Sequence, residues 1–352
     1  MKIGYLTQTL DTGTGGGRFA FNLIDGIKKK GFEVVILKET DDDTEGIPML
    51  RRGYKIFSNI NEIRHTLRDC DIIHALDGYP YGIIAWIVNM KLNKKLFISA
   101  QGTYSIAPLY NWKTSFFLKR AYRAAHKVIA ISQFTRDEIL RKIDLKNIII
   151  IKHGIEKKNL PDHIIKKSER YLLSVGGIKE RKGYNVSIEA FGLIKDVFPD
   201  LQYIIVGDRD AAWQTVLDKI IDKYSLRERV IFKENISDDL LQILYRNASL
   251  FILTPINTQS HHIEGFGLVY LEAARAGVPV IGTIGTGAVD AINNGKNGIL
   301  VPQLDIVETS KGISSILSDH ALQLSMSLES SKWAAMNSIE GQISNFIQEY
   351  TN

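Results

Sequence analysis

One stretch of sequence decides the fold class of this chain: Glu264-Gly-Phe-Gly-Leu-Val-Tyr-Leu-Glu272-Ala-Ala-Arg-Ala-Gly277-Val-Pro279-Val-Ile281. Its middle part, Leu268–Ala276, is rich in good helix formers, and Gly277 followed by Pro279 predicts the end of a helix. The apolar residues after the proline predict a buried strand. A helix followed at once by a buried strand is the repeating unit of an α/β protein.

The same alternation extends outward from this stretch through most of the chain. We expect strands at Lys2–Thr7, Phe32–Leu37, Asp71–Leu76, Leu96–Ala100, Val128–Ile131 and Asn147–Ile151, and then at Tyr171–Val175, Leu201–Val206, Val230–Lys233, Leu250–Leu253 and Pro279–Gly282. Helical segments separate them, such as Arg18–Lys30 with Gly31 as its stop. This pattern predicts parallel sheets wound on both faces.

The alternation breaks once, at the charged segment His153–Arg170, which we interpret as a linker. The prediction is therefore two tandem doubly wound domains, residues 1–160 and 170–335, with a helix at 338–352 packing back on the first. A length of 352 residues suits two domains. Ligands of open α/β sheets bind beyond the carboxyl ends of the strands, so two such domains facing each other predict a binding cleft.

Composition excludes several classes of protein. The chain is 45% hydrophobic and 24% charged, as in soluble globular proteins. Its net charge of +5 is too small to indicate nucleic-acid binding. Cys70 is the single cysteine, which fits a cytoplasmic protein without disulfides. No run approaches the ~20 apolar residues of a membrane span, and no signal peptide is evident at the start.

Two glutamates flank the amino end of the predicted helix. Glu264 stands in the loop before it and Glu272 in its second turn. Gly265 and Gly267 permit close backbone approach, and a helix amino end attracts a pyrophosphate. Carboxylates placed in this way can accept hydroxyl hydrogen bonds from a sugar and a ribose on either side of the diphosphate. The alternative is a loop charge and a solvated helix residue.

Taken whole, Glu264 through Ile281 closely resembles the signature of glycosyltransferase family 4, whose members are retaining enzymes of the GT-B fold with two Rossmann-like domains. Five further segments resemble parts of this family. They are its phosphate-binding loop (Val175–Gly183), its next strand end (Ile205–Asp208), its late loop (Asn294–Pro302) and two first-domain landmarks (Ala125–Ser132 and His153–Glu156). The resemblance implies that Glu264 holds the transferred sugar and Glu272 the ribose. It also implies that Gly265, Phe266, Gly267 and Leu268 border the donor.

Arg181 and Lys182 follow a predicted strand and suit phosphate oxygens. By position alone a solvated basic turn is an equal interpretation. The resemblance implies that both cations stabilise the leaving diphosphate and act as catalytic residues with Glu264. Many family members carry arginine where this chain has Gly177, and we interpret Arg181 as its replacement.

The glycines Gly13, Gly15, Gly16 and Gly17 lie between the first strand and the helix Arg18–Lys30. A nicotinamide-binding fingerprint fits poorly, because its last glycine is replaced by Arg18. The resemblance implies instead that Gly16 and Gly17 approach the donor phosphates, with a flexible turn as the alternative. Gln101 stands where many relatives have histidine, and its amide can bind a hydroxyl on the acceptor or sugar side.

A helix predicted at Trp112–Lys127 has a basic and aromatic face. At 100° per residue, five cations share a sector of about 120° with Trp112 and Phe116: Lys113, Lys119, Arg120, Arg123 and Lys127. Such a face suits an anionic membrane surface. The alternative is a solvated helix whose two aromatic rings pack on a neighbouring loop.

The resulting hypothesis is a retaining glycosyltransferase that moves a sugar from a UDP- or GDP-linked donor to a glycan, lipid-linked or small-molecule acceptor, without cofactor or metal. It would work in cell-envelope glycan biosynthesis, in the cytoplasm or on the inner face of the membrane. Nucleotide-sugar epimerases and sugar phosphorylases share the architecture, and an inactive nucleotide-binding scaffold is the alternative from another class.

Overall fold

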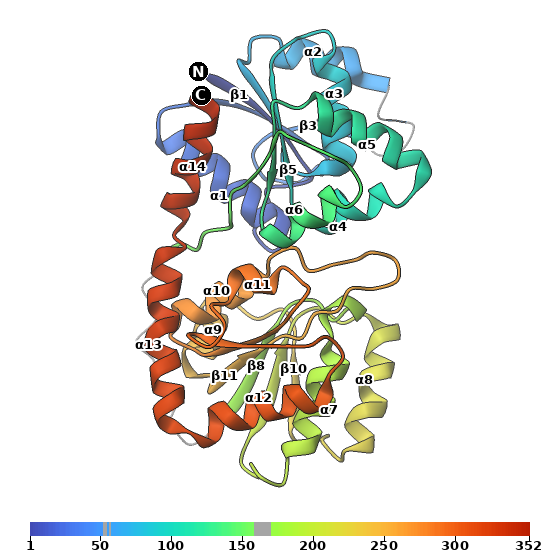
Figure 1. Ribbon diagram of the computed structural model, residues 1–352. Helices are drawn as coiled ribbons and strands as arrows, with labels where there is room; N and C mark the ends of the chain where they lie inside the picture. Colours follow the sequence, from blue (N-terminus) through green and yellow to red (C-terminus); the bar gives the residue numbers. More distant parts are fainter. Residues whose placement is uncertain (52–54, 56–57, 158–169) are drawn as a thin grey trace. The chain divides into compact units, whose positions relative to one another are not determined.

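The computed structural model describes residues 1–51, 55, 58–157 and 170–352. The chain divides into two compact units (Figure 1). Unit 1 comprises Met1–His153 together with Ile339–Asn352, and unit 2 is the continuous segment Gly154–Ser338. The segment predicted as a linker, His153–Arg170, falls largely on residues 158–169, which lie outside the described part of the chain.

Unit 1 is built on a parallel sheet with the strand order β3-β2-β1-β4-β5-β6-β7. Its strands are β1 (Lys2–Thr7), β2 (Glu33–Lys38), β3 (Ile47–Pro48), β4 (Ile72–Ala75), β5 (Lys95–Ala100), β6 (Lys127–Ala130) and β7 (Ile148–Ile150). Its helices are α1 (Gly15–Lys29), α2 (Ile60–Leu67), α3 (Ile83–Asn89), α4 (Thr103–Ile106), α5 (Trp112–Ala124), α6 (Gln133–Leu140) and α14 (Ile339–Thr351). There are also two short helical turns: η2 (Gly78–Gly82) lies shortly after β4, and η3 (Ala107–Leu109) directly follows α4.

Helix α14 belongs to the core of unit 1 although it follows unit 2 in the chain. It packs against α1, where Gly26 leaves room for Ile343. The hydroxyl of Tyr350 lies 2.6 Å from Nδ1 of His74, whose Nε2 lies 2.9 Å from the hydroxyl of Ser99. Burial lowers the pKa of His74 to about 3. This imidazole is therefore neutral and serves as a hydrogen-bonding link between the sheet and α14.

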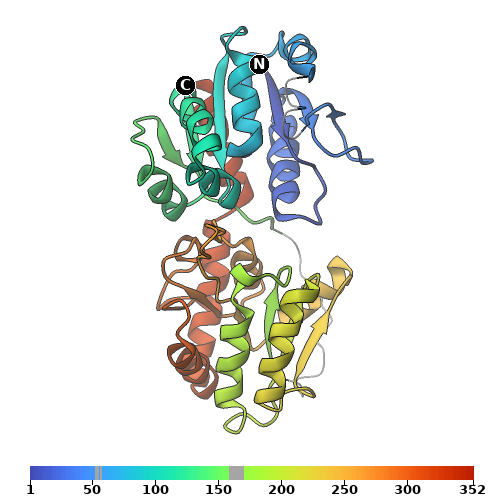
Figure 2. The same cartoon turned by 90° about the vertical axis from the view of Figure 1, so that its right-hand side faces the viewer.

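Unit 2 repeats the architecture with the strand order β10-β9-β8-β11-β12-β13, again all parallel. Its strands are β8 (Tyr171–Val175), β9 (Gln202–Val206), β10 (Val230–Lys233), β11 (Leu250–Ile252), β12 (Val280–Thr283) and β13 (Gly298–Val301). Its helices are α7 (Tyr184–Ile194), α8 (Ala211–Lys223), α9 (Asp238–Asn247), α10 (Leu268–Arg275), α11 (Ala288–Ala291), α12 (Ile306–Ser318) and α13 (His320–Met336), with the short turn η4 (Glu180–Lys182). Helices cover both faces of each sheet (Figure 2).

Two expected helices have different bounds in the structure. Helix α1 begins at Gly15 rather than Arg18, because the Thr14 side chain accepts a hydrogen bond from the amide of Gly17 and caps the helix there. Helix α5 ends at Ala124, and Lys127 pairs with Phe97 in the sheet. The expected place of Lys127 on the helix face is therefore wrong.

Among the helices of the described residues, none combines the length and the apolar composition that crossing a membrane requires.

Candidate functional site

Three charged side chains predicted from separate motifs meet in unit 2. Oε2 of Glu264 accepts a hydrogen bond from Nζ of Lys182 at 2.6 Å and from Nη1 of Arg181 at 2.7 Å. Lys182 is only 8% exposed and Glu264 only 9%. The alternatives of a solvated basic turn and a solvated loop charge are therefore wrong for these residues.

The backbone around this cluster depends on close glycine contacts. Gly183 has a φ of +68°, and a Cβ atom on it would lie 1.7 Å from the carbonyl oxygen of Thr254. The hydroxyl of Thr254 donates to the carbonyl of Gly183 at 2.7 Å. The turn that carries Arg181 and Lys182 is thereby locked against the loop after β11, which leads to Glu264.

A second close approach holds the loop of Glu264 itself. The amide of Gly287 donates to the carbonyl of Glu264 at 2.8 Å, and a Cβ atom on Gly287 would meet the carbonyl of Gly265 at 2.1 Å. Gly267, with a φ of +86°, directly precedes α10. Phe266 is buried and Leu268 is half-buried. The residues predicted to border the donor, Gly265 through Leu268, thus form one turn at the amino end of α10.

The electrostatics of the cluster favour the ionised carboxylate. Burial by itself would raise the pKa of Glu264, but the charges of Lys182 and Arg181 outweigh it and lower that pKa to about 2. Burial lowers the pKa of Lys182, while Glu264 acts in the opposite direction. With two cations and one carboxylate, the cluster carries a net positive charge that suits an anionic ligand.

Glu272 lies in the second turn of α10 and is 5% exposed, so the alternative of a solvated helix residue is wrong. Its Oε2 accepts a hydrogen bond from the hydroxyl of Tyr245 on α9 at 2.8 Å. Sequence reasoning did not single out Tyr245, because nothing in the spacing links α9 with α10. The carboxylate is thus buried and oriented by a neighbouring helix.

The two glycines predicted at the donor phosphates have different surroundings in unit 1. A Cβ atom on Gly17 would lie 2.0 Å from the carbonyl oxygen of Asp11, so packing alone requires glycine there. A Cβ atom on Gly16 would meet nothing within 4 Å. Gly16 is the glycine that borders open space, and it lines a hollow in this unit.

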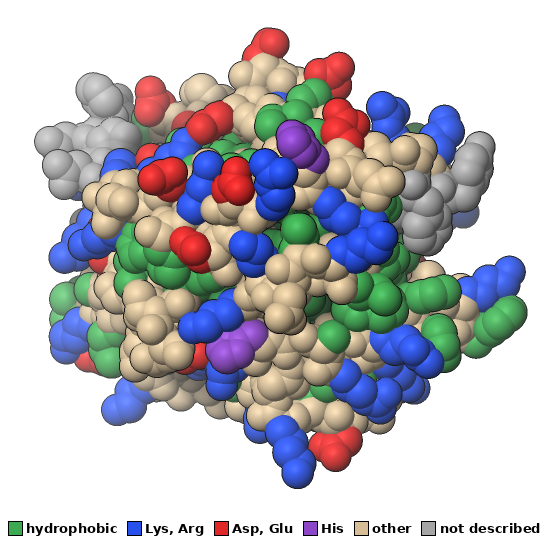
Figure 3. Space-filling model, turned by 90° about the horizontal axis from the view of Figure 1, so that it is seen from above, with side chains coloured by type: hydrophobic (Ala, Val, Ile, Leu, Met, Phe, Trp, Pro, Cys, Tyr) green, Lys and Arg blue, Asp and Glu red, His purple; other side chains and the backbone are tan. Residues whose placement is uncertain are grey.

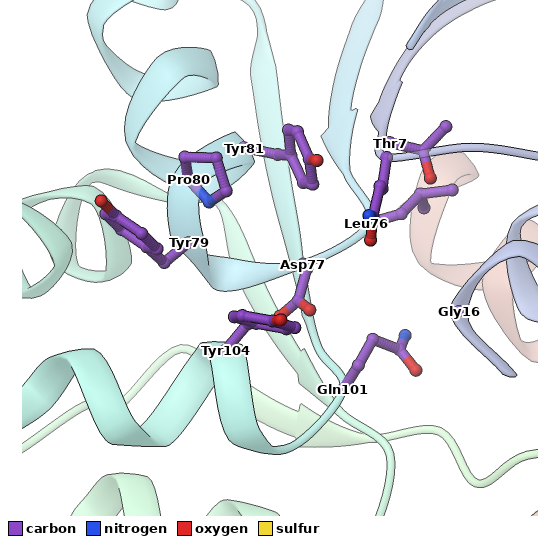
Figure 4. A pocket seen from close by; sticks show the side chains of 10 residues that line it. Thr7, Gly16, Leu76, Asp77, Tyr79, Pro80, Tyr81, Gln101 and Tyr104 are labelled. Atoms are coloured by element: carbon purple, nitrogen blue, oxygen red, sulfur yellow. The ribbon is translucent and has the colours of Figure 1, made fainter. Parts of the chain in front are cut away.

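This hollow lies beyond the carboxyl ends of β1, β4 and β5 (Figure 4). Its empty volume is about 640 Å³, open solvent at its mouth included. Gln101, predicted on the acceptor or sugar side, extends its amide from the end of β5. Its Nε2 is buried and has no hydrogen-bond partner among the described residues. Such a donor costs free energy unless a ligand or water supplies an acceptor.

Asp77 faces the same hollow between Tyr104 and Gln101 (Figure 4). Its Oδ1 accepts hydrogen bonds from the hydroxyl of Ser105 at 2.5 Å and from the amide of Gly78 at 2.7 Å. Burial raises the pKa of Asp77 to about 6, against the lowering effect of these hydrogen bonds. Sequence reasoning missed Asp77, although a carboxylate directly after the predicted strand Asp71–Leu76 is a recognisable signal.

Helix α5 has an uncovered aromatic and basic face. Trp112 is 79% exposed and Phe116 is 54% exposed, so the alternative in which both rings pack on a neighbouring loop is wrong. The guanidinium of Arg120 stacks 4.3 Å from the centre of the Phe116 ring. Figure 3 shows hydrophobic and basic side chains side by side at the right-hand edge of the view.

Within the described ranges no three histidine, cysteine, aspartate or glutamate side chains lie close enough together to hold a metal ion.

Comparison with known proteins covers both units. The family model for glycosyl transferases group 1 matches residues 155–333, and the model for glycosyltransferase family 4 matches residues 13–158. An uncharacterised glycosyltransferase of Methanocaldococcus jannaschii is 25% identical over 279 residues, which are 79% of this chain and 73% of the relative. The capsular polysaccharide biosynthesis glycosyltransferase CapM of Staphylococcus aureus is 27% identical over 333 residues, 85% of this chain and 84% of CapM.

Among solved structures, Anabaena HepE in complex with UDP matches with a TM-score of 0.85 at 18% identity, over 100% of both chains. The same protein with UDP-glucose matches with a TM-score of 0.82 at 18% identity, over 99% of both chains. The predicted α/β architecture of the GT-B class is thereby confirmed.

Proposed function

Because this chain belongs to the glycosyl transferases group 1, we propose that it is a retaining glycosyltransferase that moves a sugar from a nucleoside diphosphate sugar to a hydroxyl acceptor. The observation that carries this proposal is the cluster in which Arg181 and Lys182 converge on Glu264. Two cations fixed at the end of a strand are suited to a diphosphate leaving group.

In the proposed reaction the bond between the sugar C1 and the diphosphate oxygen breaks, and its electron pair stays on that oxygen. The acceptor oxygen forms the new bond to C1, and the acceptor proton passes to the departing diphosphate. Negative charge grows on the diphosphate in the transition state, so Arg181 and Lys182 stabilise the transition state more than the bound donor. Glu264 holds both cations in place and accepts a hydrogen bond from a hydroxyl of the transferred sugar.

We propose that the nucleoside diphosphate binds at α10. Gly265, Phe266, Gly267 and Leu268 form the turn at its amino end, which favours the diphosphate. Glu272 accepts hydroxyl hydrogen bonds from the ribose. Because HepE has been solved with UDP and with UDP-glucose, UDP-linked sugars are the first donors to test. GDP-linked sugars are the next. The roles of Gly16 and Gly17 at the donor phosphates stay predictions.

We propose retention on the family resemblance, and we propose that no metal or cofactor is required because Arg181 and Lys182 supply the positive charge. A peripheral membrane location is proposed on α5, whose exposed Trp112 and Phe116 share a face with Lys113, Arg120 and Arg123. The acceptor would then be a lipid-linked or envelope glycan, in keeping with relatives such as CapM.

The test is turnover of UDP-glucose, UDP-N-acetylglucosamine and GDP-mannose, followed by mass analysis of acceptor products. Release of nucleoside diphosphate with a heavier acceptor supports a transferase. An isomerised donor without release would indicate an epimerase, and the absence of turnover with every donor would indicate a scaffold. The coupling constant of the anomeric proton in the product then decides between retention and inversion.

A further inference from the structure

The hollow of unit 1 brings three strand ends together. Thr7 ends β1, Leu76 directly follows β4, and Gln101 directly follows β5. All its lining residues belong to unit 1, so its shape and chemistry can be described within that unit alone. Its polar groups and its apolar walls both restrict which ligand can bind there.

Two of the polar side chains that line the hollow, Gln101 and Asp77, differ in their hydrogen-bonding capacity. Nε2 of Gln101 is a buried donor without an acceptor among the described residues. When it is ionised, the carboxylate of Asp77 can accept hydrogen bonds but cannot donate one. An alcohol hydroxyl both donates and accepts, and neighbouring hydroxyls on one ring can satisfy the two side chains together.

The walls are mainly aromatic. Tyr79, Pro80, Tyr81 and Tyr104 line the hollow (Figure 4). Flat apolar surfaces of this kind suit the C–H face of a saturated ring, while a few polar groups fix its orientation. Tyr104 is 54% exposed, so its ring is available at the mouth of the hollow and contributes little to the core of the unit.

The charge among the residues that line the hollow is negative only. Of the residues that line it, within the part of the chain that the structure describes, Asp77 carries a negative charge and none carries a positive one. Ser105 and Gly78 already donate to Oδ1 of Asp77 and hold the carboxylate in place. A phosphate or carboxylate placed directly against Asp77 would meet repulsion there without a compensating cation.

We infer that this hollow binds the acceptor as an uncharged, polyhydroxylated ring, and that Asp77 selects it against phosphorylated and acidic sugars. Asp77 and Gln101 bind ring hydroxyls, and Tyr104 covers one face of the ring. This inference rests on the proposed function, because it is the transferase reaction that makes the ring an acceptor.

The state of Asp77 supports the inference. Burial raises the pKa of this carboxyl to about 6, so keeping it ionised at neutral pH opposes folding. Asparagine has the same shape and can accept the same hydrogen bonds from Ser105 and Gly78. A buried carboxylate that hydrogen bonds hold against a hollow, at a cost in free energy, is typical of a ligand-binding position.

The experiment measures saccharide binding by saturation-transfer NMR on the full chain in the presence of UDP. The neutral probes are methyl α-D-glucopyranoside, N-acetylglucosamine and myo-inositol, and the anionic probes are glucose 6-phosphate and glucuronate. We expect at least one neutral probe to bind more tightly than every anionic one. Asp77→Asn should weaken neutral binding about tenfold, as expected for loss of a charge-assisted hydrogen bond. It should also reduce the discrimination against anions.

Asp69→Asn is the matched control, because Asp69 is an exposed aspartate of the same unit, with 76% of its side chain accessible. Tyr104→Ala is a second test, which should weaken neutral binding without altering the charge preference. Melting curves show whether each variant folds. The inference is overturned if anionic probes bind the wild type more tightly, if Asp77→Asn binds like the wild type, or if no neutral probe binds.

Different results would refute the proposed function and the inference about the hollow. Saccharide binding sensitive to Asp77, together with no nucleotide-sugar turnover under any condition, would leave the hollow a sugar site in a protein that is not a transferase. Transfer to phosphorylated acceptors that is indifferent to Asp77→Asn would keep the transferase and refute the inference.

Discussion

Nζ of Lys182 lies 2.6 Å from Oε2 of Glu264, although 82 residues separate them in the chain. Lys182 stands on the turn after β8, and Glu264 stands on the loop before α10. The contact joins the two loops that carry the proposed chemistry. Arg181 contacts the same oxygen, so the three side chains form one electrostatic unit.

Lys182→Ala should lower kcat by about 10²–10³, the cost typical of losing one group that stabilises developing charge. Lys179→Ala is the control, because Lys179 is an exposed lysine in the same turn. Steady-state kinetics with the active donor measure both variants. Wild-type kcat in Lys182→Ala would show that the ion pair is only structural.

Glu272→Gln should weaken nucleotide binding by about tenfold or more, because a ribose hydroxyl loses a charged acceptor. Tyr245→Phe removes only the hydroxyl that orients this carboxylate and should have a smaller effect. Calorimetric titration with UDP and GDP measures both. An unchanged dissociation constant in the Glu272 variant would refute the ribose assignment.

Glu264→Gln should lower the free energy of unfolding at neutral pH and have a progressively smaller effect in acid. The pKa of Glu264 is lowered to about 2 in the folded chain, from an ordinary value of 4.5. Its ionised form therefore stabilises the fold above pH 4.5, and this contribution is lost as the pH falls through 2. The lowering of this pKa corresponds to a free energy on the order of 3 kcal/mol.

The measurement for this prediction is urea unfolding of both proteins from pH 7 to pH 2. The wild type should be more stable at neutral pH, and the difference should shrink steadily below pH 4.5. A difference that is independent of pH would mean that packing, rather than charge, accounts for the effect.

Activity should persist in a metal chelator, because Arg181 and Lys182 are proposed to balance the diphosphate charge. The check is the initial rate in EDTA, compared with the rate after addition of magnesium or manganese. Complete loss in EDTA that either metal restores would contradict the proposal.

Binding to anionic vesicles should weaken but persist as salt rises. Each cation near an anionic surface contributes about 1 kcal/mol that salt screens, whereas burial of Trp112 and Phe116 is insensitive to screening. Arg120→Glu with Arg123→Glu should abolish most binding in a vesicle flotation assay. Lys311→Glu with Lys332→Glu, two exposed lysines of unit 2, is the control with the same charge change. If the wild type ignores phosphatidylglycerol vesicles at low salt, α5 is an ordinary solvated helix.

Much of the fold could be predicted from hydrophobic periodicity. The ends of β1, β8 and β10 agree with the sequence-based expectation, because each is a short apolar run bounded by turn residues. The strand β3, Ile47–Pro48, was missed because two residues carry no periodic signal. The segment of β13 was read only as a late loop, and its pairing with β12 depends on tertiary contacts.

The candidate site could be predicted only in part. The motif around Glu264 and the basic turn were recognisable from their residues, but no spacing rule places them in contact. Tyr245 and Asp77 were missed for different reasons. Tyr245 reaches its partner through helix packing, whereas Asp77 follows a strand and could have been noticed. The start of α1 was misplaced because glycines at 15–17 resemble a loop until Thr14 caps them.

The return of α14 to unit 1 imposes an order on biosynthesis. Unit 2 is one uninterrupted segment, so it can complete its fold as soon as it leaves the ribosome. Unit 1 is translated first but must wait for Ile339–Thr351, since Tyr350 closes the network around His74. The apolar surface of unit 1 that Ile343, Phe346 and Tyr350 cover is therefore without its helix while unit 2 is being translated. Chaperone dependence during synthesis should accordingly be a property of the amino-terminal half of the sequence.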